Sequence, residues 1–211
     1  MEGSKVKTPQ EKFWSGDFGN GYIIRNKNQQ LISSSLAMYA KIIAKTRGIE
    51  SVLEFGANIG INLIAIKQIL PGIELSALEI NASAVKELKK LSLKNIYHTS
   101  FFDYEVDYQR DFVFTRGVLI HLNPDKLPDA YQILYTSSKR YICITEYYNP
   151  TPVVIPYHGQ NDRLFKRDFA GELMDKYKDL KLVDYGFAYH RDSNFPQDDV
   201  TWFLLEKTKG E

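Results

Sequence analysis

The sequence predicts a doubly wound α/β fold, in which a mostly parallel sheet carries helices on both faces. The first indication is a short apolar run, residues 52–55, that ends in a turn containing Gly56 and Gly60. Apolar residues at helical spacing follow this turn as far as Pro71, so strand, glycine turn and helix form one unit. The second indication is that strands and helices go on alternating along the chain. Ligands bind outside the carboxyl ends of the strands in such sheets, so we expect the functional site there.

The elements can be placed in order from the spacing of apolar residues. A helix is expected before the first strand, because apolar residues recur at helical spacing from Leu31 to Ala44. The elements that follow are strand 52–55, helix 59–69, strand 74–78, helix 82–91, strand 95–99, strand 111–115, helix 126–137 and strand 140–145. Pro150 to Gln160 is predicted to be a proline-rich loop, and Lys166 to Tyr177 has helical spacing. The last two strands, Lys181–Tyr189 and Val200–Glu206, flank a polar connection of hairpin character, which gives seven strands with one antiparallel.

Length and composition indicate one domain with no marked attraction to nucleic acid or membranes. The 211 residues suffice for a single core, with residues 1–46 as an N-terminal lid and helix and residues 47–211 as the α/β core. The 27 Lys and Arg against 26 Asp and Glu leave a formal net charge of +1. No apolar stretch approaches the ~20 residues of a membrane span. Because Met1 to Lys7 is polar and lacks a signal region, and Cys143 lies in a buried-type strand, we expect a cytoplasmic protein.

The turn after the first strand favours a ligand without phosphates. It reads Glu-x-Gly-x-x-x-Gly from Glu54 to Gly60, with Asn58 where a dinucleotide fold would have its second glycine. Glu54 is placed to serve an ammonium group, while amides of the loop serve a carboxylate. S-adenosylmethionine carries both groups. The alternative is an ordinary strand-helix turn whose glycines permit tight packing.

A second acid supports an adenosyl ligand. The strand 74–78 ends in Glu79-Ile80-Asn81, about 20 residues after the glycine turn, where an acid can hydrogen-bond a ribose diol. The alternative is that Asn81 caps the next helix and Glu79 is its solvated neighbour. Together, the glycine turn and this acid favour an adenosyl-binding site.

Several segments resemble known enzymes. They are Thr8-Pro9-Gln10-Glu11-Lys12-Phe13-Trp14, Tyr22-Ile23-Ile24-Arg25-Asn26, Gly117-Val118-Leu119-Ile120-His121-Leu122-Asn123-Pro124 and Leu164-Phe165-Lys166-Arg167-Asp168-Phe169. Over nearly the whole chain the pattern resembles the class I S-adenosylmethionine-dependent methyltransferases. These segments more narrowly resemble the methyltransferases associated with pseudaminic acid biosynthesis. The chain departs mildly from the wider family, since many members carry Asp at the position of Glu54.

The resemblance implies a Rossmann-like sheet with strand order 3-2-1-4-5-7-6 and S-adenosylmethionine bound at its carboxyl edge. It also implies an acceptor from a sugar pathway, either a nonulosonic acid or its nucleotide-linked precursor or product. Two alternatives remain: an adenosyl-binding regulatory or scaffold protein without catalysis, and an NAD-dependent oxidoreductase. The missing third glycine and Asn58 argue against the oxidoreductase.

Further donor contacts are expected from two segments. Adenine is expected after the third strand, where the amide of Phe101 can read the ring edge and Asp103 can accept from the exocyclic amine. The alternative is that Asp103 only forms a turn. The N-terminal segment is expected to cover the donor through Trp14, Tyr22, Arg25 and Asn26. The alternative is that its aromatic residues only attach the segment to the core.

Candidate catalytic residues follow the fourth and fifth strands, beside the expected methyl donor. Histidine is the side chain whose ordinary pKa lies nearest neutral pH, so His121 is a candidate base, or else a structural histidine of the Asn123-Pro124 turn. Glu146 is the second candidate base, or else a solvent-facing acid. Tyr147 and Tyr148 are expected to stack on the acceptor, unless they only pack.

An anionic acceptor would need cations, since the net charge supplies none globally. The candidate cations are Arg116, Arg163 and Arg167, and Tyr157 and His158 are further candidate substrate-binding residues in the loop after the fifth strand. Four scattered histidines and one cysteine show no metal-ligand spacing, so no metal is expected. The sequence leaves a homo-oligomer open.

Overall fold

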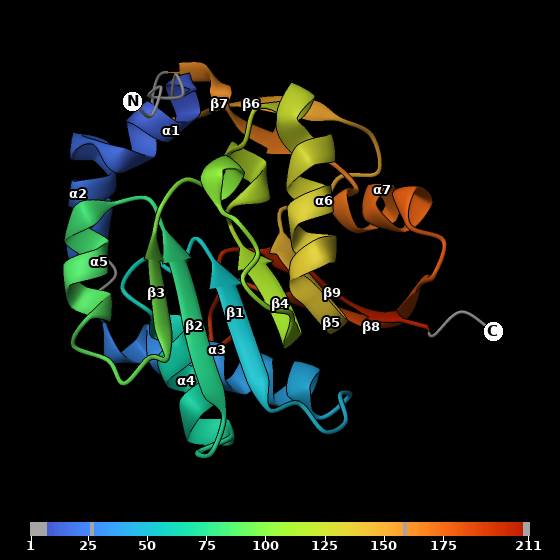
Figure 1. The fold of residues 1–211 in the computed structure, drawn as a ribbon. Helices are drawn as coiled ribbons and strands as arrows, with labels where there is room; N and C mark the ends of the chain where they lie inside the picture. The colour runs from blue at the N-terminus through green and yellow to red at the C-terminus, as the bar shows by residue number, and fades with distance from the viewer. Residues whose placement is uncertain (1–7, 26–27, 158–159, 209–211) are drawn as a thin grey trace.

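The structure is a computed structural model that describes residues 8–25, 28–157 and 160–208. For residues 24, 25, 157 and 160–163 within these ranges, it describes only the backbone. Its centre is a seven-stranded sheet of order β3-β2-β1-β4-β5-β9-β8 (Figure 1). The strands are β1 (Ser51–Phe55), β2 (Glu74–Glu79), β3 (Asn95–His98), β4 (Arg110–Arg116), β5 (Ser138–Glu146), β8 (Leu180–Ala188) and β9 (Val200–Lys207). β9 runs opposite to the other six strands. The predicted fold class is therefore confirmed, with β8 and β9 as the sixth and seventh strands of the predicted order.

Helices cover both faces of this sheet (Figure 1). The helices of the described residues are α1 (Pro9–Ser15), α2 (Asp17–Arg25), α3 (Gln29–Ile43), α4 (Ile61–Ile69), α5 (Ala82–Leu88), α6 (Leu127–Ser137) and α7 (Phe169–Lys176), of which α1 and α2 lie at the carboxyl edge of the sheet. Alternate residues of the central strands point to opposite faces, so Val113 of β4 packs with α6 and α7, while Phe112 and Phe114 pack with α3 and α4. The sheet is thus buried on both sides, as its apolar strands require.

A two-stranded hairpin corrects one prediction. Residues expected to form a loop, Pro150 to Gln160, instead contribute to β6 (Val153–Tyr157) and β7 (Gln160–Lys166), which pair antiparallel outside the main sheet. The β-branched run at 153–155 favours a strand despite the flanking prolines. Because β7 extends to Lys166, α7 begins later than predicted, at Phe169, after Asp168 accepts a hydrogen bond from the Gly171 N–H at 2.8 Å.

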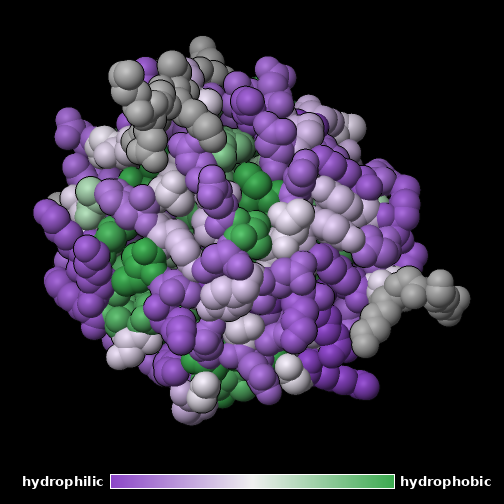
Figure 2. Space-filling view, in the orientation of Figure 1, coloured by the Kyte–Doolittle hydropathy of each residue, from purple (hydrophilic) through white to green (hydrophobic). Residues whose placement is uncertain are grey.

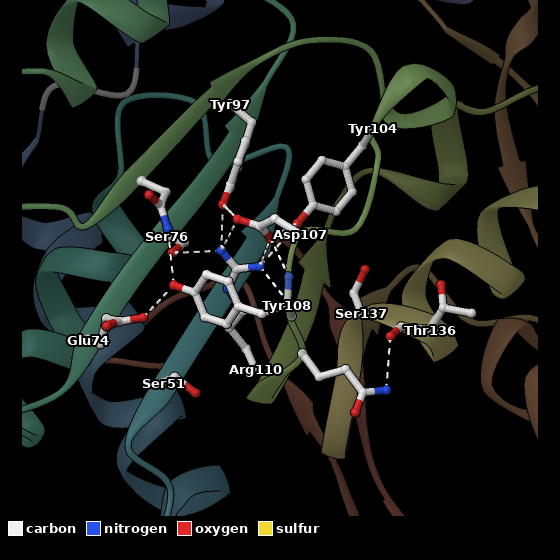
Figure 3. Close-up of polar contacts among 12 residues, drawn as sticks. Ser51, Glu74, Ser76, Tyr97, Tyr104, Asp107, Tyr108, Arg110, Thr136 and Ser137 are labelled. Atoms are coloured by element: carbon white, nitrogen blue, oxygen red, sulfur yellow. Dashed lines mark hydrogen bonds and ion pairs between the residues drawn. The ribbon is translucent and has the colours of Figure 1, made fainter.

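A buried arginine anchors the segment between β3 and β4 (Figure 3). Arg110 is fully buried and donates to the Tyr97 hydroxyl at 2.5 Å, the Tyr104 hydroxyl at 3.1 Å and the Tyr108 carbonyl at 2.7 Å. It also forms an ion pair with Asp107, and this pairing helps to hold the pKa of that carboxyl below its usual range, against the effect of burial. The network ties the 99–109 segment to the sheet, and that segment includes a 3-10 turn at Phe101–Asp103.

The face of the molecule in Figure 2 is mostly polar. Figure 2 shows hydrophilic residues over most of one face, with apolar residues visible between them. Among the described residues, no helix has the length and apolar character needed to cross a membrane.

Candidate functional site

A cavity of about 250 Å³ opens at the carboxyl edge of the sheet, where β1, β2 and β4 end. Eleven of the residues singled out in the sequence line it: Trp14, Tyr22, Glu54, Gly56, Asn58, Glu79, Ile80, Phe101, Arg116, His121 and Tyr147. The cavity therefore lies where the fold class predicts a ligand, and it gathers residues from the N-terminal helices, the strand ends and the turn after β3.

The carboxylate of Glu54 at the end of β1 is buried, and only one of its two oxygens has a hydrogen-bond partner. The Asn62 side chain, in the first turn of α4, donates to its Oε1 at 2.6 Å. Its Oε2 has no hydrogen-bond partner. Burial raises the pKa of Glu54 to about 8, while the Asn62 hydrogen bond and the charge of Arg116 act in the opposite direction. A cationic ligand group at Oε2 would satisfy this oxygen and favour the ionised form.

The carboxylate of Glu79 at the end of β2 is held by backbone amides. The Asn58 N–H donates to Oε2 and the Asn81 N–H to Oε1, both at 2.7 Å. Burial raises the pKa of Glu79, and these bonds oppose that effect. Each carboxylate oxygen can accept a second hydrogen bond, so Glu79 presents two fixed acceptors to the cavity.

The two glycines of the turn have different neighbours. Both have positive φ, 73° at Gly56 and 84° at Gly60. A Cβ at Gly56 would lie 2.4 Å from a Val118 methyl, so this glycine lets the turns after β1 and β4 approach. A Cβ at Gly60 would meet side chains of Leu91 and Leu88 at 2.6 and 3.0 Å. The close approach at Gly60 is made by these leucines, and Gly60 does not line the cavity.

Helices α1 and α2 form a cover over the cavity. Asn81 donates from its side chain to the Trp14 carbonyl and to the Asn20 side chain, both at 3.1 Å. Glu11 accepts a hydrogen bond from the Ser100 hydroxyl. The same Asn81 caps α5, since its Oδ1 accepts from two amides there. The cover is thus fixed to the α5 cap and to the segment after β3.

His121 lies in a 3-10 turn, Leu119–His121, and is largely buried at the cavity wall. Its ring centre lies 4.7 Å from that of Trp14. Tyr147 lines the cavity as well, and the Lys166 ammonium lies 5.0 Å from the centre of its ring. These side chains place an imidazole among aromatic rings.

Glu146 has a different environment from that predicted. It is 2% exposed, and its carboxylate accepts from the backbone amides of Val118, Leu119 and Ile120 at 3.0, 3.1 and 3.4 Å. Burial raises its pKa to about 7, against the effect of these bonds. Glu146 is neither solvent-facing nor among the cavity residues, so its geometry favours holding the turn that carries His121.

The remaining candidates lie apart from the cavity or outside the described atoms. Tyr148 and Arg167 line a separate small hollow, where Arg167 forms an ion pair with Glu172 at 2.6 Å. Asp103 follows the cavity residue Phe101 but does not itself line the cavity. Asn26 and His158 lie outside the described residues, as do the side chains of Arg25, Tyr157 and Arg163.

Sequence reasoning did not single out three residues that contact Arg116. Arg116 donates to Asn62 Oδ1 at 2.7 Å, to the Ser35 hydroxyl at 2.8 Å and to the Gln197 side-chain oxygen. Asn62 sits two residues past Gly60, the last position of the motif, and Gln197 lies in the β8–β9 connection. Only the three-dimensional arrangement brings these residues to Arg116, at the end of β4.

Comparison with known proteins supports the fold. No protein-family model matches the sequence, and no curated protein sequence matches it. Solved structures do match. The 1,6-didemethyltoxoflavin N1-methyltransferase of Burkholderia thailandensis, solved with S-adenosylhomocysteine, has a TM-score of 0.69 at 13% identity, over 98% of this chain and 93% of that one.

Two further solved structures are similar to this chain over nearly their whole length. The magnesium protoporphyrin IX methyltransferase of Synechocystis, with bound SAM, gives a TM-score of 0.65 at 11% identity, over 97% of this chain and 100% of that one. A plantazolicin methyltransferase in complex with SAH gives 0.62 at 14% identity, over 95% and 94% of the two chains. At these identities, the likeness establishes that the chain shares its fold with these enzymes.

Proposed function

We propose that this protein is an S-adenosylmethionine-dependent methyltransferase that acts on a small molecule. The observation that carries the proposal is the pair of buried carboxylates, Glu54 and Glu79, at the ends of neighbouring strands on one cavity. The match to methyltransferase structures supports it.

The described residues fit the donor. Glu54 leaves one buried oxygen without a partner, which suits the ammonium of the methionine part. Glu79 offers two fixed acceptors to the ribose hydroxyls, and Ile80 and Phe101 lie beside it on the cavity wall for the adenine. When bound, S-adenosylmethionine supplies a methyl group on a sulfonium ion. Trp14 and Tyr22, from the helices that cover the cavity, then exclude water from it. Orientation of the acceptor is the main requirement for methyl transfer.

His121 is the candidate general base. Its imidazole lines the cavity beside Trp14, and a base of this kind contributes typically ~10²–10⁴-fold to removal of a proton from a hydroxyl or amine acceptor. We assign Glu146 to positioning, since its carboxylate holds the turn that carries His121. His121→Ala is expected to lower turnover and to leave donor binding unchanged.

The acceptor proposal rests on the sequence segments that resemble pseudaminic acid-associated methyltransferases. A sugar acid or nucleotide-linked sugar of that pathway is the acceptor we propose to test first. Tyr147 lines the cavity with the Lys166 cation over its ring, a combination that suits a sugar bearing an anionic group.

The test has two stages. Calorimetry compares S-adenosylmethionine with NAD on wild type, Glu79→Ala and a control, Glu74→Ala, at the opposite end of β2. We expect Glu79→Ala to weaken donor binding at least roughly tenfold, because it removes acceptors and leaves two amides unpaired. Mass spectrometry then screens acceptors for the gain of one methyl group. Donor binding without turnover of any acceptor would favour the non-catalytic alternative, and binding of NAD alone would favour the oxidoreductase.

A further inference from the structure

A group of aromatic rings lies on the sheet outside the cavity. Along β8 and the residue after it, Tyr185, Phe187 and Tyr189 are 64%, 60% and 45% exposed. Because alternate residues of a strand point to one face, these rings stand on the same side of the sheet. Phe203 of β9 lies opposite Tyr185, with 6.2 Å between the ring centres, and Tyr148 lies 5.7 Å from Phe203. Together these five rings form the β8 patch.

The β8 patch is exposed because helix α7 covers only the other end of these strands. Leu173 of α7 shares an apolar cluster with Leu180 of β8 and Leu205 of β9. Leu182, opposite Leu205 and so on the same face, is already half-exposed. A helix of eight residues is about 12 Å long, whereas a strand of nine residues spans about 30 Å. Helix α7 is therefore too short to cover the Tyr185 end of β8 as well.

The β8 patch is separate from the cavity. Tyr147 and Val200 line the cavity, whereas the next residues, Tyr148 and Thr201, line the small hollow beside α7. That hollow has a volume of about 10 Å³, which is room for about one water molecule. It is therefore no site for a small ligand, and the rings beside it form a nearly flat surface. A flat apolar surface of this kind suits another protein surface.

Polar contacts at the rim of the β8 patch restrict how a partner can bind. β8 is the last strand of the sheet, where an added strand could pair with the edge (Figure 1). The Tyr185 N–H, however, donates to the Asp184 side chain at 2.9 Å, and Asp184 forms an ion pair with Lys45 at 3.3 Å. Arg167, at the hollow, is paired with Glu172. A partner therefore meets the ring face, and these rim charges favour neither an acidic nor a basic one.

We infer that the β8 patch is the interface of a homodimer, in which two copies pack their patches face to face about a two-fold axis. Every copy carries the same flat, apolar surface, and two-fold pairing is the commonest assembly of soluble proteins. Since an aromatic side chain buries about 150–250 Å², the exposed parts of the rings offer on the order of 400 Å² in each copy. A standard interface buries about 800 Å² per partner, in an apolar core with a polar rim. The β8 patch has the size of such a core.

The test measures the oligomeric state of the whole chain in solution, and it does not depend on the proposed function. Sedimentation velocity is run from about 1 to about 100 µM on wild type, on the double variant Tyr185→Thr/Phe187→Thr and on a control, Val106→Thr. Threonine removes the ring and keeps a side chain that suits a strand. Val106 is also exposed, but it follows β3, the strand at the opposite edge of the sheet. Phe187→Lys is a second variant, which places like charges in the two patches.

We expect wild type to sediment at twice the 24.4 kDa of one chain at the higher concentrations. The double variant should raise the dissociation constant of the dimer at least about thirtyfold, because central aromatic residues carry most of the binding energy of an interface. Phe187→Lys should be monomeric, and Val106→Thr should dimerise as wild type does. Circular dichroism checks that each variant is folded. A wild type that stays monomeric at about 100 µM would overturn the inference, as would a dimer of unchanged affinity in either patch variant.

Discussion

Asn62 donates to Glu54 across 2.6 Å, so the first turn of α4 fixes one oxygen of a buried carboxylate and leaves the other for the cavity. Asn62 also accepts from Arg116, which couples the acid indirectly to a cation. The arrangement allows Glu54 to be buried without a direct ion pair. It also makes the charge of Glu54 dependent on what enters the cavity.

Donor affinity should depend on pH through Glu54. Its pKa is raised by burial to about 8, so the carboxyl is mostly neutral at pH 7, whereas an ammonium ligand needs the ionised form. Affinity for S-adenosylhomocysteine should therefore fall by roughly tenfold for each pH unit below that value. Calorimetry from pH 6 to pH 9 measures this, and Glu54→Gln should bind weakly with a flat profile. A flat profile in wild type would show that Glu54 does not titrate with binding.

Without ligand, the same acid should lower stability at alkaline pH. A carboxyl whose folded pKa exceeds its unfolded value keeps its contribution below the unfolded pKa, near 4.5, and loses it as pH rises to about 8. Glu54→Gln should therefore raise the thermal midpoint at pH 8 by several degrees and change it less at pH 5. Thermal unfolding at the two pH values checks this. An equal shift of the thermal midpoint at both pH values would contradict a raised pKa of Glu54.

The backbone contacts of Glu146 predict a structural loss when it is truncated. Glu146→Ala leaves the amides of Val118 and Leu119 buried without their acceptor, at a cost of about 1–3 kcal/mol for each unsatisfied group. Urea unfolding of Glu146→Ala and Glu146→Gln measures this. The glutamine variant keeps an acceptor oxygen and should lose less stability and retain turnover. Loss of turnover in a fully stable Glu146→Gln would instead support Glu146 as the base.

Asn81 offers a matched pair that separates its two contacts. Asn81→Asp keeps the oxygen that caps α5 but removes the amide that holds the Trp14 carbonyl, whereas Asn81→Ala removes both. We expect Asp to leave stability nearly unchanged and to speed release of the donor, while Ala also costs about 0.5–2 kcal/mol of stability. Stopped-flow dissociation and urea unfolding measure the two effects. Equal release rates for wild type and Asn81→Asp would contradict a covering role of α1 and α2.

The fold was predictable from the sequence because its strands are apolar and its helices periodic. The run at 52–55 and the acid after 74–78 placed β1, β2 and the cavity correctly. The β6–β7 hairpin was not predicted, since prolines flank its β-branched residues. The local pattern of apolar residues predicts which side chains are buried and whether a segment is a helix or a strand. It carries no information on which turns pack on one another.

The candidate site was most directly predictable where a residue lies at the end of a strand. Glu54 and Glu79 follow strands and line the cavity. The environment of Glu146 was not predictable, because its partners are amides of the turn after β4, which lie 26–28 positions earlier in the chain. Gln197 belongs to a polar connection that has no motif, so its contact with Arg116 required the fold itself.

A crystal structure of the protein with S-adenosylhomocysteine tests the central claim most directly. The account predicts the ligand in the cavity at the carboxyl edge, with its ammonium within about 3.2 Å of Glu54 Oε2 and its ribose hydroxyls on the Glu79 carboxylate. A ligand bound elsewhere, or a nucleoside turned so that neither glutamate contacts it, would contradict the account.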